Sequence, residues 1–98
     1  MENITQQTWI NHIDSTENAK VIDVRTPGEC AAGTLPDAIQ IDIMNQAEFT
    51  NAIANLDKSD TYFVYCQSGG RSAQACQYME SQGLKTYNLA GGMMSWRQ

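Results

Sequence analysis

Short apolar runs alternate along this chain with segments in which apolar residues recur at helical spacing. Runs rich in β-branched and aromatic residues are typical of buried strands, and a repeat of three or four residues is typical of a helix with one buried face. Thr26, Pro27 and Glu29 form a helix-start signal with a capping box. The pattern predicts strands at residues 19–24, 38–41, 61–65 and 85–89, and helices at residues 6–13, 27–32, 46–54, 72–82 and 93–96.

This alternation of strands and helices predicts an α/β fold. No linker, internal repeat or low-complexity segment divides the 98 residues, so we expect one domain over residues 1–98. Strands that alternate with helices form a mostly parallel sheet joined by right-handed crossovers, with helices packed on it as a sandwich. Ligands bind such sheets at the carboxyl ends of the strands. We therefore expect functional side chains directly after the predicted strands.

The segment Cys-Gln-Ser-Gly-Gly-Arg-Ser at residues 66–72 joins a predicted strand to a predicted helix. Gly69 and Gly70 let the backbone curl, so that successive N–H groups point at one centre where an anion can sit. The amino end of the helix and the guanidinium of Arg71 should lower the pKa of a thiol there into the range of roughly 3.5–7.5 seen for activated cysteines. Cys66 is therefore the predicted nucleophile.

The rest of this loop is predicted to bind the anion that the nucleophile attacks. Arg71 should attract and hold its charged end, and backbone N–H groups should stabilise an anionic intermediate as an oxyanion hole does. Ser72 has a second interpretation, as the cap of the following helix. The predicted catalytic residues are Cys66 and Arg71, and the predicted substrate-binding residues are Gln67, Ser68, Gly69, Gly70 and Ser72.

Asp23 and Arg25 end another predicted strand, and they should lie at the same edge of the sheet. We interpret them as supporting residues rather than catalytic ones. By the spacing of four residues, Arg25 is expected to reach Glu29.

Charge and hydropathy exclude several classes of partner. Six Lys and Arg face eleven Asp and Glu, and the net charge of −5 argues against nucleic acid and anionic membranes. No apolar run approaches the roughly 20 residues that span a bilayer, and the first residues do not resemble a secretory signal. We therefore expect a cytoplasmic protein with no membrane partner.

The three cysteines and the single histidine do not form a metal-binding or disulfide pattern, so we expect neither a metal nor a cofactor. His12 lies in the first predicted helix and is interpreted as a surface residue. Cys76 shares a helical face with core residues, which favours a structural role. Cys30 is interpreted as structural too, with a resolving thiol for Cys66 as the alternative.

Four motifs occur together, in order and at the spacing of a known family, and the chain resembles a single-domain rhodanese. The resemblance implies a rhodanese-like three-layer α/β sandwich with a five-stranded, mostly parallel sheet. It also implies a sulfurtransferase that moves sulfane sulfur from a donor such as thiosulfate onto Cys66 as a persulfide, and then to cyanide, a thiol or a protein acceptor. The motifs lie at residues 21–29, 32–38, 65–72 and 89–96.

Two other functions are alternatives to sulfur transfer, namely a phosphatase or arsenate reductase of the same fold and a non-catalytic binding module. Four residues separate Cys66 from Arg71, which resembles sulfur-transfer loops, whereas related phosphatases and arsenate reductases carry one residue more. The family often has histidine where Thr34 stands and an aromatic residue where Cys30 stands. A regulatory module that binds an anion or a thiol without turnover is the alternative from a different class.

Overall fold

The computed structural model describes residues 1–97 and shows a parallel sheet with helices on both faces, so the predicted α/β sandwich is confirmed. The strand order is β1-β5-β4-β2-β3, and every pairing is parallel. The strands are β1 (Glu2–Ile4), β2 (Ala19–Asp23), β3 (Ile39–Gln40), β4 (Thr61–Tyr65) and β5 (Lys85–Leu89). The helices are α1 (Gln6–Ser15), α2 (Pro27–Cys30), α3 (Gln46–Ala54) and α4 (Gly70–Ser81), followed by a 3₁₀ turn, η1 (Met93–Ser95).

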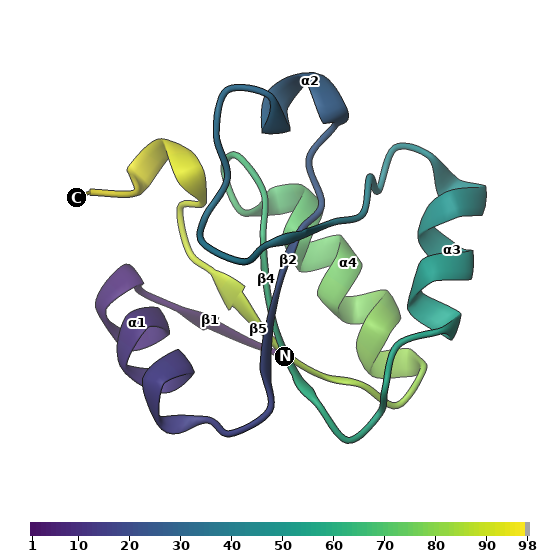
Figure 1. The fold of residues 1–98 in the computed structure, drawn as a ribbon, viewed down its shortest axis with the longest axis horizontal. Helices are drawn as coiled ribbons and strands as arrows, with labels where there is room; N and C mark the ends of the chain where they lie inside the picture. The colour runs from purple at the N-terminus through teal and green to yellow at the C-terminus, as the bar shows by residue number, and fades with distance from the viewer. Residues whose placement is uncertain (98) are drawn as a thin grey trace.

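The central strand β4 contributes side chains to both halves of the core, because its side chains alternate between the two faces of the sheet. Tyr62 and Val64 pack in the cluster that α3 and α4 cover, and Phe63 and Tyr65 pack in the cluster that α1 covers. Trp9 of α1 meets both of these rings edge-on, with centroids 5.5 Å from Phe63 and 6.1 Å from Tyr65. Figure 1 shows α1 on one side of the sheet and α3 and α4 on the other.

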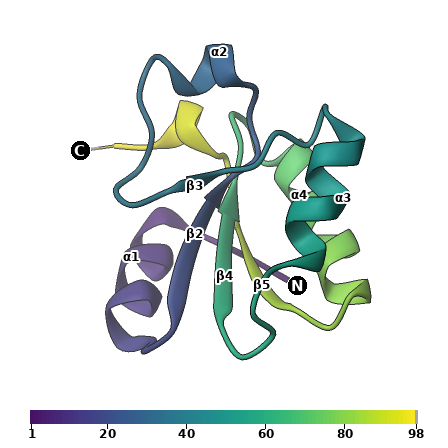
Figure 2. The same ribbon diagram turned by 45° about the vertical axis from the view of Figure 1, so that its right-hand side comes forward.

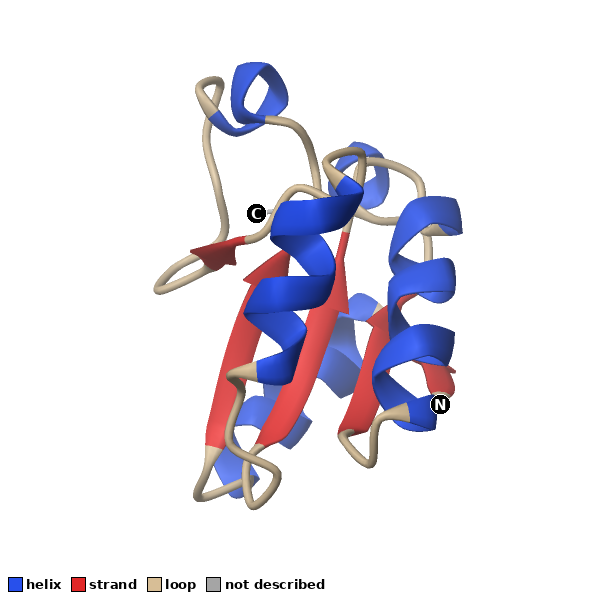
Figure 3. Ribbon diagram, turned by 90° about the vertical axis from the view of Figure 1, so that its right-hand side faces the viewer, coloured by secondary structure: helices blue, strands red, loops and turns tan. Residues whose placement is uncertain are grey.

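The carboxyl ends of the central strands form one edge of the sheet. Figure 2 shows α2 and the first turn of α4 at this edge, and Figure 3 shows α4 running from there along the face of the sheet. Because Cys66 follows β4 directly, it lies at this edge together with the end of β2. The topology therefore gathers the predicted nucleophile and the predicted supporting residues.

Three differences from the predicted elements concern β1, β3 and the start of α4, whereas the other bounds shift by no more than two residues and the last predicted helix is a 3₁₀ turn. Strand β1 is absent from the prediction because it is only three residues long and buries Ile4 alone. Strand β3 is two residues long rather than four. Helix α4 begins at Gly70 instead of residue 72, because Gly69 takes the N-cap position with a left-handed φ of 104°.

Within residues 1–97, no helix is long and apolar enough to cross a membrane. The same residues contain no group of three His, Cys, Asp or Glu side chains that could hold a metal ion.

Candidate active site

Cys66 lies at the floor of the loop between β4 and α4, with none of its surface exposed. Its Sγ accepts hydrogen bonds from the backbone N–H of Gly69 at 3.1 Å, from the backbone N–H of Ser72 at 3.4 Å and from the Ser72 hydroxyl at 3.3 Å. The predicted convergence of N–H groups on one point is therefore present, and the sulfur atom occupies that point.

The pKa of the Cys66 thiol is lowered from its ordinary value. Burial acts in the opposite direction, because it disfavours the charged thiolate, but the hydrogen bonds from Ser72, Gly69 and Ser68 outweigh it. The direction agrees with the sequence-based expectation, while the cause is more local, since hydrogen bonds from the loop and the first turn of α4 stabilise the thiolate.

Ser72 does not cap helix α4. It is the third residue of the helix, it is fully buried, and its hydroxyl donates to Cys66 Sγ. Gly69 is the N-cap and offers no side-chain hydrogen bond. The alternative role of Ser72 as a cap was therefore wrong, and its hydroxyl belongs to the surroundings of the thiol.

Arg71 points from the first turn of α4 toward α2 and forms an ion pair with Glu29. Its Nη1 lies 2.7 Å from Oε1 and its Nη2 lies 2.8 Å from Oε2 of that carboxylate. Glu29 also completes the capping box of α2 with Thr26. The guanidinium hydrogen bond lowers the pKa of the Glu29 carboxyl from its ordinary value to about 2, so the pair stays ionised at neutral pH.

Arg25 does not reach Glu29, so that sequence-based expectation was wrong. Its Nε and Nη2 bind Asp23 instead, with Nη2 2.8 Å from Oδ2, and both side chains are buried. Nη2 also donates to the Gly33 carbonyl at 2.6 Å, and Nη1 donates to Gln67 Oε1 at 3.2 Å. The pKa of Asp23 is lowered because hydrogen bonds, chiefly from Arg25, outweigh its burial. The pair thus links the end of β2 to the cysteine loop.

A second loop, between β5 and η1, packs against the cysteine loop. Met93 N–H donates to the Cys66 carbonyl at 3.0 Å, and Met94 N–H donates to the Gln67 carbonyl at 2.9 Å. Gly92 has a φ of 58°, and a Cβ there would lie 2.5 Å from the Cys66 carbonyl oxygen. The Gly91-Gly92 dipeptide is the sequence signal for this close approach.

The other two cysteines differ from Cys66 in their ionisation. Burial raises the pKa of the Cys76 thiol to about 11, and it raises the pKa of the Cys30 thiol, which faces Asp23, to about 11 as well. Cys76 is a residue of α4 and is fully buried in the core, as expected. Of the three thiols, Cys66 is the one whose pKa is lowered.

Comparisons with known proteins place this chain in a family. The profile of the rhodanese-like domain matches residues 5–98. The chain is a rhodanese-like domain. It is 36% identical over 97 residues to a protein of Allochromatium vinosum named sulfurtransferase, covering 89% of this chain and 88% of that protein. It is 38% identical over 82 residues to the thiosulfate sulfurtransferase GlpE of Pseudomonas fluorescens, covering 83% of this chain and 72% of that protein.

A solved structure agrees with this assignment of the fold. The rhodanese-like domain superposes on the crystal structure of SSP1007 from Staphylococcus saprophyticus subsp. saprophyticus with a TM-score of 0.85. The two share 33% sequence identity, and the match covers 99% of this chain and 94% of that one. The family resemblance and the five-stranded fold predicted from the sequence motifs are both confirmed.

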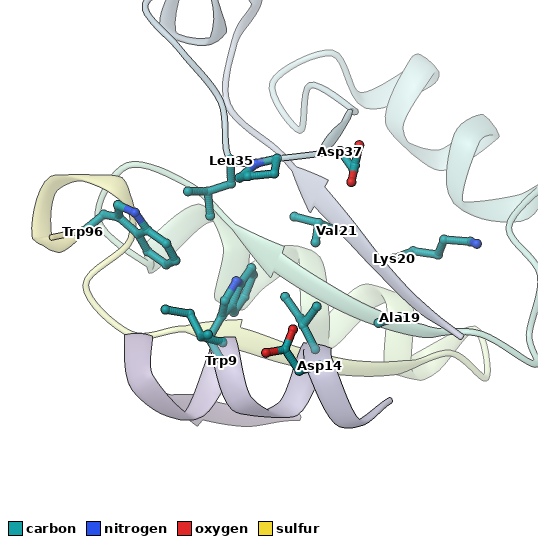
Figure 4. Close-up of a pocket in the computed structure, with 11 residues that line it drawn as sticks. Trp9, Asp14, Ala19, Lys20, Val21, Leu35, Asp37 and Trp96 are labelled. Atoms are coloured by element: carbon teal, nitrogen blue, oxygen red, sulfur yellow. The ribbon is translucent and has the colours of Figure 1, made fainter. Parts of the chain in front are cut away.

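Of two pockets in the rhodanese-like domain, one borders the cysteine loop and the other does not. A groove of about 500 Å³ runs between α3 and α4 and has Arg71 in its wall, next to Phe49 and Tyr78. A pocket of about 420 Å³ lies on the α1 side, where Trp9 and Trp96 line it together with Leu35 (Figure 4). Its lining includes none of residues 66–72, so this second pocket is separate from the thiol.

Proposed function

We propose that this rhodanese-like domain is a sulfurtransferase that moves sulfane sulfur from thiosulfate or a persulfide donor to a thiophilic acceptor through a persulfide on Cys66. The observation that carries the proposal is the environment of one sulfur atom. Cys66 Sγ lies where a strand meets a helix, N–H groups from Gly69 and Ser72 converge on it, and the pKa of its thiol is lowered. Relatives named sulfurtransferase and thiosulfate sulfurtransferase support sulfur transfer as the reaction of this site.

The proposed reaction has two steps, each an attack by a nucleophile on sulfur. The Cys66 thiolate attacks the outer sulfur of thiosulfate, a bond forms between the two sulfurs, and sulfite leaves with the electron pair of the broken S–S bond. Cys66 then carries a terminal sulfur with one negative charge. Cyanide or a thiolate attacks that terminal sulfur, and the Cys66 thiolate is regenerated as the leaving group.

The loop stabilises the anion at each step. N–H groups of Gly69 and Ser72 and the Ser72 hydroxyl already point at the sulfur, so they need no reorganisation when charge develops there. Gln67, Ser68 and Gly70 form the rim through which the donor enters, because Ser68 and Gly70 are exposed and Gln67 is half-buried. Asp23 and Arg25 support this rim through the Gln67 side chain.

Arg71 is assigned to the anionic end of the donor. A guanidinium has five N–H donors, and Glu29 takes one from each terminal nitrogen, so donors remain for a second anion. The net charge of −5 on the whole chain repels a small anionic donor, so the donor requires a local positive charge, which Arg71 supplies. A reducing cytoplasm would keep the Cys66 thiolate free for the reaction, and we place the protein there.

A second candidate is a module that binds an anion or a thiol without turnover. The full burial of Cys66 and the engagement of Arg71 by Glu29 favour it, since both limit the reach of a substrate. Binding without transfer predicts no thiocyanate under any condition. The two candidates are therefore separable by one assay.

The test is thiocyanate formation from thiosulfate and cyanide, followed for the wild type and for Cys66→Ala, with Cys76→Ala as the matched thiol control. The proposal predicts turnover in the wild type and Cys76→Ala and none in Cys66→Ala. A persulfide donor is run in parallel, so that a preference against thiosulfate is not mistaken for inactivity. No transfer with either donor from folded, reduced protein would overturn the proposal, and turnover of a phenyl phosphate or arsenate would reassign the site.

A further inference from the structure

Asn88 is a buried polar residue that connects the edge of the sheet to the cysteine loop. It is the fourth residue of β5, and only 2% of its surface is exposed. Its Nδ2 donates to Asn3 Oδ1 of β1 at 2.8 Å and to the Gly69 carbonyl at 3.2 Å. A chain of contacts thus runs from β1 through β5 to the residue that caps α4.

Gly69 is the residue in the cysteine loop that most needs an external support. Its backbone is left-handed, with a φ of 104°, and the helix that it begins has no side-chain cap. Its N–H donates to Cys66 Sγ, while its carbonyl accepts from Ala73 N–H at 3.1 Å and from Asn88. Because rotation about its two backbone bonds sets the direction of its N–H relative to its carbonyl, fixing the carbonyl restricts where the N–H points.

An asparagine at position 88 is favoured over an apolar residue of similar size only if the hydrogen bonds of its amide have a function. Both neighbours of its Nδ2, Asn3 Oδ1 and the Gly69 carbonyl, are acceptors, and an amide nitrogen has two hydrogens to give them. Its Oδ1 is buried and has no hydrogen-bond partner among the residues that the structure describes. An unpaired buried oxygen destabilises a fold, so packing alone would favour leucine here.

We propose that Asn88 is a positioning residue, which holds the Gly69 carbonyl so that the Gly69 N–H stays directed at the sulfur of Cys66. Asn3 fixes the Asn88 amide in turn. The inference deepens the proposed function, because a directed N–H matters most when Cys66 acts as an anionic nucleophile. It concerns the resting thiolate, however, and is testable without any sulfur donor.

The test is a titration of the Cys66 thiolate by its ultraviolet absorbance. Each variant is measured with and without Cys66→Ala, and the difference isolates Cys66 from the other two thiols. Asn88→Ala is expected to raise the pH of half-ionisation and to lower the thiolate fraction at neutral pH several-fold. Asn3→Ala, which leaves the bond to Gly69 but releases the amide, is expected to give a smaller shift in the same direction.

Thr86→Val is the matched control. Thr86 lies in the same strand, is buried to the same degree, and hydrogen-bonds to Glu80 rather than to the loop. Thr86→Val should lower the stability of the protein without changing the titration of Cys66. The control therefore separates a positioning effect on Cys66 from a general loss of structure.

An unshifted titration in folded Asn88→Ala would overturn the inference, and so would an equal shift in Thr86→Val. If Asn88→Ala does not fold, as judged by circular dichroism, an unshifted titration in Asn3→Ala overturns it instead. The absence of sulfur transfer in the wild type would contradict the proposed function. The titration would still test the positioning role of Asn88, because it needs no sulfur donor.

Discussion

Arg71, in the cysteine loop, and Glu29, in α2, are joined through both terminal nitrogens of the guanidinium, with N···O distances of 2.7 and 2.8 Å. The pair connects the short helix α2 to the first turn of α4 through two residues that are 42 positions apart in the sequence. It also places a negative charge beside the cation that we assign to the donor. Glu29 is therefore expected to moderate how strongly an anionic donor binds.

Glu29→Gln is predicted to lower the KM for thiosulfate by several-fold, because it removes a negative charge next to the donor and keeps an oxygen that can accept from Arg71. The pair is partly exposed, so its loss should change stability by no more than about 1 kcal/mol. Steady-state kinetics at low and high salt are the measurement. Glu17→Gln, the same charge change beside the start of β2, is the control, and a KM that rises in Glu29→Gln alone would contradict this account.

Glu29 should also make stability depend on pH at the acid end. The guanidinium of Arg71 lowers the pKa of its carboxyl from 4.5 to about 2 in the folded protein. A carboxyl with a lower pKa in the folded state stabilises the fold above its unfolded pKa, and the contribution is lost as the pH falls through the folded value. Acid unfolding of the wild type and Glu29→Gln should therefore converge between about pH 4.5 and 2. A difference that stays constant across this window would argue against the ion pair.

The central part of the site follows from local sequence, which is why it could be predicted. Cys66, the two glycines and the helix after them are contiguous, and strand-then-loop-then-helix patterning places them at the carboxyl edge of a parallel sheet. The four motifs likewise indicated the fold family, because together they resemble those of the rhodanese family. The roles of the loop residues in sulfur transfer stay predictions until they are measured.

What the sequence did not reveal depends on contacts between distant segments. Glu29 was paired with Arg25 by the spacing rule for helices, but α2 begins only at Pro27, so Arg25 is outside the helix and turns to Asp23. Strand β1 shows no alternation over its three residues, and it forms only because β5 offers it a free edge. The contact of Asn88 with Gly69, across 19 residues, has no local signal at all.

Ser72→Ala is predicted to raise the pKa of the Cys66 thiol, since it removes the hydroxyl that donates to Sγ at 3.3 Å while the backbone N–H remains. The rising limb of the pH profile of kcat/KM should move to higher pH, so that activity lost at neutral pH is partly recovered in alkaline buffer. Ser81→Ala, at the far end of the same helix, should leave the profile unchanged. A uniform loss of activity at every pH would show that Ser72 acts in another way.

Gly92→Ala is predicted to disturb the cysteine loop from the side of the second loop. The added Cβ would lie 2.5 Å from the Cys66 carbonyl oxygen at a φ of 58°, so both loops must shift, at a loss of stability of about 1–3 kcal/mol. Sulfur transfer should fall with it. Gly28→Ala, where a Cβ meets nothing within 4 Å, should keep full activity and stability. Equal behaviour of the two variants in thermal unfolding and in the transfer assay would refute the close approach.

The most direct test of the central claim is the intact mass of the protein after treatment with a sulfur donor. The account predicts that the wild type gains the mass of one sulfur atom, that the adduct maps to Cys66 and that cyanide removes it as thiocyanate, whereas Cys66→Ala gains nothing. An adduct that persists in Cys66→Ala, or none in folded and reduced wild type with thiosulfate or a persulfide, would contradict the assignment of Cys66 as the sulfur carrier.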